Sequence, residues 1–304
     1  MSSSTSAPPV PRSLSPSRAS DFMTCPLLYR FRVVDRIPER PGAAAVRGTL
    51  VHAVLERLFD LPADRRTPES ARDLLQPEWQ RLREDDPSVV TVFHDDEVWQ
   101  AHLDGTPAPD PDPDTLASWL AESEPLLATY FALEDPTRLE PAERELRVEV
   151  ALDSGLVLRG FIDRVDVSPD GLVRVVDYKT GRSPSESFEQ KALFQMRFYA
   201  LVLWRMHGVV PRMLQLLYLG NGEVLRYQPD EADLRATERK LESLRAAIDR
   251  ATETGDWRAS PSRLCDWCDH RARCPAWGGT PPPLPPAAPP ADLRADDFSP
   301  VADD

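Results

Sequence analysis

Two neighbouring stretches of the chain have the pattern of β-strands, and each carries an acidic residue among apolar ones. Residues 160–167 and 173–179 are joined by the turn Ser168-Pro-Asp-Gly171. Because side chains alternate between the two faces of a strand, Asp163 and Asp177 each share a face with apolar neighbours. An unpaired buried carboxylate is costly or becomes protonated, and two carboxylates directed at one place repel each other. A divalent cation resolves both problems, and oxygen ligands suit Mg²⁺ or Mn²⁺. The pattern therefore predicts a sheet that holds a metal ion.

Lysine is rare in this chain, which makes Lys179 informative. Of the 36 basic residues, 33 are arginine and only Lys179, Lys191 and Lys240 are lysine. Lys179 lies two residues beyond Asp177, roughly 7 Å along a strand, which places its ammonium group where an attacking water or a phosphate oxygen would sit. A compact ammonium suits this role better than a permanent guanidinium fork. The alternative is that the two acids lie in turns at strand ends and that Lys179 is a solvated neighbour.

Hydrophobic periodicity along the rest of the chain predicts an α/β (α+β) fold. The pattern predicts helices at 15–24, 27–34, 48–59, 69–84, 114–134, 187–207 and 230–253, and strands at 146–152, 157–167, 172–178, 213–219 and 223–227. The last two strands form a hairpin across Asn221-Gly222. No apolar run is long enough for a membrane helix, and the N-terminus lacks a secretory pattern, so we expect a cytoplasmic protein without membrane contact.

The charge of the chain is unevenly distributed. The net charge of −14 at first argues against nucleic-acid binding. However, residues 60–145 carry 22 acidic and only 7 basic side chains, and residues 275–304 carry 5 and 1. The remaining parts, which contain every motif described here, are mildly basic. The acidity is therefore no evidence against a DNA-binding core.

Four motifs together resemble the RecB-type branch of the PD-(D/E)XK nuclease superfamily, which includes the CRISPR-associated adaptation nucleases and the AddB nuclease domain. They are Gly48-Thr-Leu-Val-His52, Gly160-Phe-Ile-Asp163-Arg-Val-Asp, Asp177-Tyr-Lys179-Thr-Gly and Gln195-x-x-x-Tyr199. The resemblance covers residues 13–276. It implies a restriction-endonuclease-like core in which helices flank a central mixed sheet.

The resemblance also implies a role for each matching residue. His52, Asp163 and Asp177 match the metal ligands, and Lys179 matches the catalytic lysine. Gln195 and Tyr199 match a pair that helps to place the substrate or the lysine. The chain departs from the family pattern in two places, since Ile162 replaces the proline before the first acid and the second acid is Asp177 rather than glutamate.

The same comparison divides the chain into three parts. Residues 1–14 and 279–304 are expected to be disordered tails. Residues 15–278 would form the nuclease domain, with residues 60–143 as an acidic helical insertion and residues 264–274 as a cysteine cluster. We expect the insertion to be a lid or partner-docking element that restricts the entry of DNA.

All four cysteines belong to one predicted site. Cys265, Cys268 and Cys274 lie near the C-terminal end, and Cys25 lies far upstream. This set resembles the iron–sulfur staple of many family members, which implies a [4Fe–4S] cluster. Zn²⁺ is the alternative ligand, and free or disulfide-bonded thiols are a third. The nearby arginines, Arg263, Arg271 and Arg273, would contact DNA phosphates. The nearby tryptophans would stack on bases or, alternatively, pack in the core; they are Trp257, Trp267 and Trp277.

These observations predict a metal-dependent DNA nuclease, a single-strand exonuclease in DNA repair or recombination that uses Mg²⁺ or Mn²⁺. The alternative is a non-catalytic DNA-binding or scaffold subunit of a helicase–nuclease complex. The chain contains no P-loop motif, so a helicase or repair partner would be another polypeptide. The remaining histidines are expected at the surface or in loops; they are His94, His102, His207 and His270.

Overall fold

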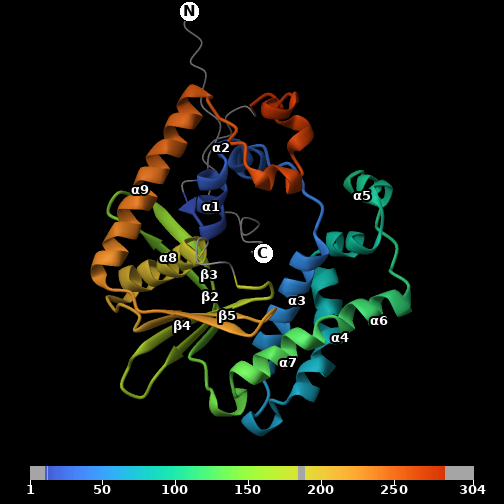
Figure 1. The fold of residues 1–304 in the computed structure, drawn as a ribbon, viewed down its shortest axis with the longest axis vertical. Helices are drawn as coiled ribbons and strands as arrows, with labels where there is room; N and C mark the ends of the chain where they lie inside the picture. Colours follow the sequence, from blue (N-terminus) through green and yellow to red (C-terminus); the bar gives the residue numbers. More distant parts are fainter. Residues whose placement is uncertain (1–10, 12, 184–188, 285–304) are drawn as a thin grey trace, which may run out of the picture.

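The computed structural model describes residues 11, 13–183 and 189–284, and its described part is built on a mixed sheet with helices on both faces (Figure 1). The strands follow the spatial order β1-β3-β4-β5-β6, with β2 also paired to β3. β3 pairs with β2 and β4 antiparallel and with β1 parallel, whereas β4 and β5 are parallel. The strands are β1 (Ser13–Leu14), β2 (Glu143–Ala151), β3 (Val157–Val167), β4 (Val173–Lys179), β5 (Met213–Tyr218) and β6 (Glu223–Tyr227). The predicted mixed α/β fold is confirmed.

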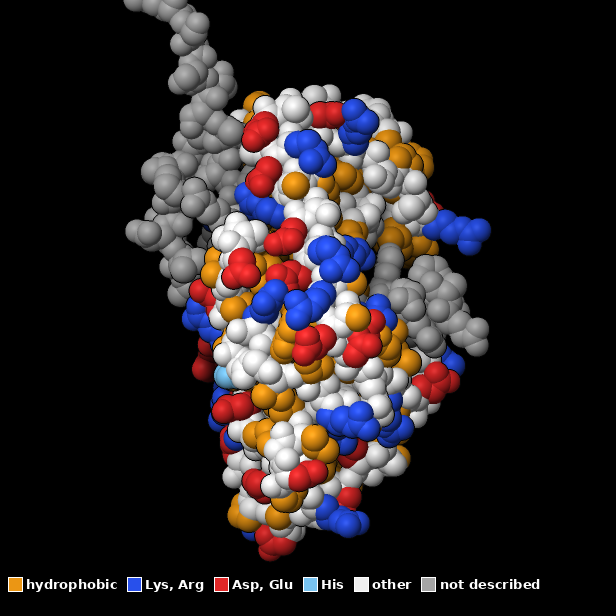
Figure 2. Space-filling view, turned by 90° about the vertical axis from the view of Figure 1, so that its left-hand side faces the viewer, with side chains coloured by type: hydrophobic (Ala, Val, Ile, Leu, Met, Phe, Trp, Pro, Cys, Tyr) orange, Lys and Arg blue, Asp and Glu red, His pale blue; other side chains and the backbone are white. Residues whose placement is uncertain are grey.

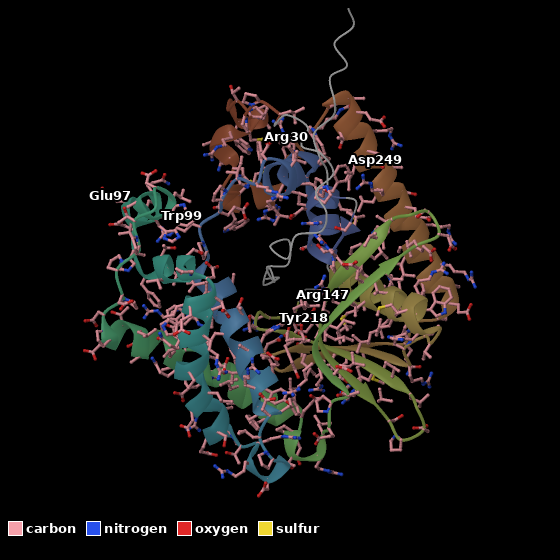
Figure 3. The ribbon with its side chains drawn as sticks, turned by 180° about the vertical axis from the view of Figure 1, so that it is seen from behind. Arg30, Glu97, Trp99, Arg147, Tyr218 and Asp249 are labelled. Carbon is pink, nitrogen blue, oxygen red and sulfur yellow. The ribbon has the colours of Figure 1, made fainter. Side chains whose placement is uncertain are left out.

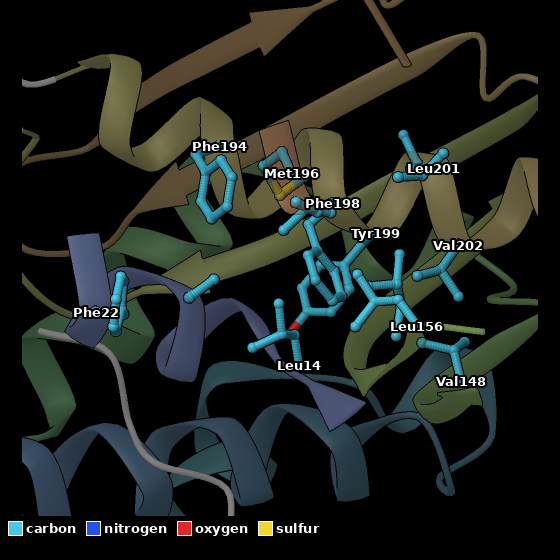
Figure 4. Packing of buried hydrophobic residues seen from close by; sticks show 14 of the residues in the cluster. Leu14, Phe22, Val148, Leu156, Phe194, Met196, Phe198, Tyr199, Leu201 and Val202 are labelled. Atoms are coloured by element: carbon cyan, nitrogen blue, oxygen red, sulfur yellow. The ribbon is translucent and has the colours of Figure 1, made fainter. Parts of the chain in front are cut away.

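One face of the sheet is covered by helices from the two ends of the chain. They are α1 (Pro16–Thr24), α2 (Pro26–Tyr29), α8 (Glu189–His207) and α9 (Glu231–Thr254). The apolar cluster beneath them takes Phe22, Phe198 and Leu201 from these helices and Leu14 from β1 (Figure 4). A capping box at Asp230 and a left-handed glycine at Gly255 bound α9.

The opposite face is covered by α3 and by the acidic helical segment. This layer contains α3 (Ala43–Leu58), α4 (Pro68–Asp85), α5 (Asp96–Leu103), α6 (Pro113–Ala121) and α7 (Glu124–Leu133). Trp79 of α4 and Tyr130 of α7 are fully buried in a cluster that also includes Val176 and Tyr178 of the sheet. The segment expected to be a lid therefore forms much of one core layer. α5, which carries Glu97 and Trp99, lies at the edge of the molecule (Figure 3).

Several predicted boundaries differ from those of the structure. Ser13 and Leu14, placed in a disordered tail, form a buried strand that pairs with Val157 and Leu158. At the other end, Leu284 packs on the first cluster, so the second tail does not begin at residue 279. The single helix expected at 114–134 is interrupted at Ser123, because Pro125 lies in the first turn of a new helix. The other residues of the predicted tails, 1–10, 12 and 285–304, lie outside the described residues, as do 184–188.

The regular alternation of β3 is broken at Asp163. Val165 on one side and Ile162 on the other both pack in the first cluster, although residues three apart in a regular strand point to opposite faces. The residue opposite Asp163 in β2 is Glu145, which lies between the paired residues Arg144 and Leu146 and has a φ of 42°. A left-handed φ is rare for a residue with a side chain. The sheet is therefore distorted where Asp163 lies.

Charged side chains of both signs are intermingled on the side of the molecule that carries α9 (Figure 2). This face shows no patch of one sign. Among the described helices, none combines the length and apolar character that crossing a bilayer requires.

Candidate active site

His52 reaches the distorted part of the sheet from α3. Val51, Leu55 and other apolar residues of this helix are buried, and the helix places His52 at the edge of that buried stripe. Its Nδ1 lies 3.5 Å from Asp163 Oδ2, and its Nε2 lies within hydrogen-bonding distance, 2.9 Å, of the Tyr178 carbonyl oxygen. The structure thus brings together His52 and Asp163, as predicted from the motifs.

The side chain of Asp163 accepts a hydrogen bond from the backbone of the neighbouring strand β4. The register of β3 and β4 brings Asp163 opposite Asp177, but regular pairing ends one residue earlier, at Arg164 and Val176. There the Tyr178 backbone N–H donates to Asp163 Oδ2 at 2.7 Å. The carboxylate therefore replaces a ladder bond and is fixed beside His52.

Glu145 is a third member of this group, and the sequence reasoning missed it. Ligand atoms of His52, Glu145 and Asp163 all lie within 4.8 Å of one another. Burial, and then the negative charges of Asp163, Glu56 and Asp177, raise the pKa of Glu145 to about 8. The available signal was its place opposite Asp163 once the two strands are paired.

Asp177 and Lys179 lie at the end of β4 and contact each other. The distance between Lys179 Nζ and Asp177 Oδ2 is 3.2 Å. Lys179 Nζ also donates to Gln195 Oε1 of α8 at 2.9 Å. The predicted link between Gln195 and the lysine is thus present. Asp177 is buried and interacts electrostatically with Glu145. The strands β2, β3 and β4 therefore each supply one acid to the same region.

Tyr199 lies one helical turn beyond Gln195 but belongs to the apolar core (Figure 4). Its ring packs against Gly160 so closely that a Cβ atom at residue 160 would lie 2.8 Å from Tyr199 Cε1. Any larger residue at 160 would have to displace the ring. The position is therefore explained by packing against β3, and its predicted role toward substrate stays a prediction.

The donor set suits a small divalent cation. Two carboxylates and an imidazole converge, and the acids outnumber the basic groups that contact them. Carboxylate oxygens favour Mg²⁺ and Mn²⁺, and a single imidazole is compatible with Mn²⁺. No described residue forms a hydrogen bond or ion pair with Glu145, and a half-buried carboxylate in that state is stabilised by a cation.

The four cysteines lie around one pocket that joins the two ends of the chain. Cys25 precedes α2, and the other three lie on the 3-10 helices η6 (Arg263–Trp267), η7 (Arg271–Arg273) and η8 (Pro275–Trp277) or their ends. Figure 1 shows residues near 260–278 beside α2. Backbone N–H groups of Ser260 and Ser262 donate to Cys25 Sγ and Cys265 Sγ at 3.4 and 3.3 Å.

The spacing of the cysteine sulfurs bears on the group that they could hold. Among described residues, which include all four cysteines, no three cysteine sulfurs lie within 4.8 Å of one another. Tetrahedral Zn²⁺ with bonds of about 2.3 Å requires sulfurs about 3.8 Å apart. The three or more sulfurs of a closed zinc site would have to lie closer together than these do.

The tryptophans near this pocket differ in their surroundings. Trp257 is buried and stacks on Tyr29 with ring centroids 6.0 Å apart. Trp267 is 77% exposed, and Trp277 lies beneath the Arg271 guanidinium at 3.9 Å. His270, expected at the surface or in a loop, lies in a turn, but it is only 1% exposed. It is covered by Glu39, at 2.6 Å, and by the ring of Phe31.

Comparisons with known proteins agree with this geometry. The family model described as PD-(D/E)XK nuclease superfamily matches residues 13–275. A crystal structure from Eubacterium rectale, described as a "putative exonuclease", has a TM-score of 0.51 and 13% identity, covering 85% of this chain and 88% of that chain. At this identity the likeness concerns the fold alone.

Two curated relatives come from mycobacterial phages. The Gene 69 protein of Mycobacterium phage D29 is 28% identical over 212 residues, which cover 64% of this chain and 69% of the relative. The Gene 69 protein of Mycobacterium phage L5 is 24% identical over 295 residues, covering 86% of this chain and 95% of the relative. Neither description states an activity.

Proposed function

Since the chain belongs to the PD-(D/E)XK nuclease superfamily, we propose that it is a divalent-metal-dependent deoxyribonuclease that uses Mg²⁺ or Mn²⁺. The observation that carries the proposal is the convergence of His52, Glu145 and Asp163 beside the contact between Asp177 and Lys179. A non-catalytic scaffold has no need to retain both the acids and the lysine.

Separate residues would bind the metal ion and stabilise the charge on the phosphate. His52, Glu145 and Asp163 would hold the metal, with Asp177 as a further candidate ligand. When bound, the metal supplies Lewis-acid polarisation of the scissile phosphate and a water of lowered pKa. Lys179, oriented by Asp177 and Gln195, would stabilise the negative charge that develops on the phosphate oxygens.

We further propose single-stranded DNA ends as the substrate. The protein of similar fold from Eubacterium rectale is described as a "putative exonuclease", which suggests action at ends but does not bear on strand preference. Exposed Trp267 offers a ring on which a base could stack, and nearby exposed arginines could meet phosphates. A role in DNA repair or recombination and a helicase partner on another chain stay predictions from the family resemblance. A cytoplasmic location stays a prediction from the hydrophobicity pattern and the N-terminal sequence.

The deciding experiment measures cleavage of end-labelled single- and double-stranded DNA with Mg²⁺ or Mn²⁺. Lys179→Ala should lower the cleavage rate by about 100-fold or more, because it removes the ammonium group that contacts Asp177. Lys240→Ala is the matched control, since Lys240 lies on α9 against Phe194, and it should cleave like the wild type. Equal rates in all three proteins would remove Lys179 from the mechanism. A lack of cleavage under every condition would favour the scaffold.

We also propose that the four cysteines hold a [4Fe–4S] cluster rather than Zn²⁺. The wide sulfur spacing and the N–H donors to sulfur support this. Protein purified without oxygen should be brown and contain iron and sulfide in equal amounts, and Cys25→Ser should lower both. A colourless wild-type protein that contains one zinc per chain would contradict the proposal.

A further inference from the structure

Tyr178 connects the candidate metal ligands His52 and Asp163 to helix α7. Its backbone is part of the site, because its N–H donates to Asp163 and its carbonyl oxygen lies 2.9 Å from His52 Nε2. Its side chain is buried, and its ring packs edge-on against the His52 ring, with centroids 5.8 Å apart. The ring also packs edge-on against Tyr130 of α7, with centroids 5.8 Å apart. Any shift of this side chain would move the backbone atoms that contact His52 and Asp163.

The Tyr178 hydroxyl is held by a buried arginine. Arg164, which is 1% exposed, donates from Nη1 to the hydroxyl oxygen at 2.7 Å. Its Nε also faces Asp166, at 3.1 Å. Arg164 directly follows Asp163 in β3, so the guanidinium bridges the two strands on the face opposite the metal-binding acids.

Glu134 in turn holds the guanidinium. Arg164 Nη2 donates to both Glu134 oxygens, at 3.0 and 2.8 Å, and Gln215 donates to one of them at 3.3 Å. Glu134 is buried at the C-terminal end of α7, the last helix of the acidic segment. A charge-assisted pair that is excluded from water fixes geometry more firmly than an exposed one.

We propose that Glu134 is a positioning residue of the active site, acting through Arg164 and the Tyr178 side chain on the backbone that fixes His52 and Asp163. This inference rests on the proposed metal-dependent nuclease function. It assigns the acidic helical segment a part in metal binding, although no residue of that segment is itself a proposed ligand. Groups that orient metal ligands commonly change metal affinity by 10–100-fold when removed, as an order of magnitude.

The test measures Mn²⁺ affinity by calorimetry without DNA, together with kcat, KM and the unfolding temperature. Glu134→Gln should weaken Mn²⁺ binding by about tenfold and lower kcat while KM for DNA stays unchanged. Glu122→Gln is the matched control, because Glu122 ends α6 of the same segment and pairs with Arg47 at the surface. It should behave like the wild type.

Tyr178→Phe provides a second route to the same answer, since it removes only the hydroxyl that Arg164 contacts. It should also weaken Mn²⁺ binding, and the double variant should be no weaker than the weaker single variant, because both changes interrupt one chain of contacts. Wild-type Mn²⁺ affinity in Glu134→Gln and Tyr178→Phe, with only a lower unfolding temperature, would overturn the inference. A wild-type protein that neither binds Mn²⁺ nor cleaves DNA would instead refute the proposed function and the inference with it.

Discussion

At the scale of single residues, the site is organised around acids that come from different strands. Glu145 of β2 and Asp163 of β3 face each other where both strands depart from regular geometry. The unusual φ of Glu145 persists because Arg144 and Leu146 on either side are paired to β3. Like charges placed this close destabilise the metal-free protein and increase its affinity for a cation.

The raised pKa of Glu145 predicts a pH dependence of stability. Its pKa rises from 4.5 to about 8 on folding, so the metal-free folded protein holds a proton there that the unfolded chain has lost. The wild type should therefore lose stability as the pH rises from about 4.5 to 8, and Glu145→Gln should lose less. Thermal unfolding in chelator at pH 6 and pH 8.5 measures this difference.

Glu149→Gln is the control for this measurement, because Glu149 lies on the same strand beside Arg147. It should keep the wild-type pH dependence. If Glu145→Gln shows the same loss as the wild type between these pH values, Glu145 is not the group that titrates.

At the scale of elements, the 3-10 helix η6, which carries Cys265, places two large apolar side chains at the surface. Trp267 and Leu264 both lie on η6 and are 77% and 51% exposed. Trp257, only ten residues earlier, is buried against Tyr29. The two tryptophans therefore have separate roles, one in packing and one at the surface.

Trp267→Ala should weaken binding of single-stranded DNA by about 1–3 kcal/mol, the usual contribution of one stacked base. Fluorescence anisotropy in a Lys179→Ala background, in which we expect no cleavage, measures the affinity. Leu103→Ala serves as the control, because Leu103 is an exposed apolar residue of α5. Equal affinities of the two variants would exclude Trp267 from the DNA-binding surface.

The sequence predicted those parts of the site that lie on motifs of regular spacing. Asp163, Asp177 and Lys179 follow from strand alternation, and His52 and Gln195 from the family resemblance. Strand pairing could have placed Glu145 opposite Asp163, but the sequence does not show the left-handed φ of 42° that Glu145 adopts there. Glu134 was also missed, since its partner Arg164 is adjacent to it only after α7 has packed on the sheet.

At the scale of the whole molecule, the acidic segment stabilises the fold. Its surface is acidic, but Trp79 and Tyr130 fill the space between α4, α7 and the sheet. The buried cluster on this face of the sheet combines residues of α3 with residues of the segment that the sequence suggested was an addition. A chain without residues 60–143 would expose Val176 and Tyr178 to water.

Trp79→Ala should lower the free energy of unfolding by about 3–5 kcal/mol, as expected for removal of a large buried side chain. Trp267→Ala should change it by less than about 0.5 kcal/mol, because that side chain is exposed. Urea titration measures both values. Deletion of 60–143 should yield insoluble protein, whereas a soluble, cooperatively unfolding product would support the lid that the sequence suggested.

The cysteine pocket has a consequence for protein synthesis, because its residues come from segments that are synthesised far apart in time. Cys25 emerges from the ribosome about 240 residues before Cys265, which corresponds to tens of seconds at ~5–20 residues per second. Until then the first thiol has none of the neighbours that surround it in the folded protein. Any translation product that stops before Cys274 lacks part of the pocket, so closure of the pocket marks the chains that have been synthesised through Cys274.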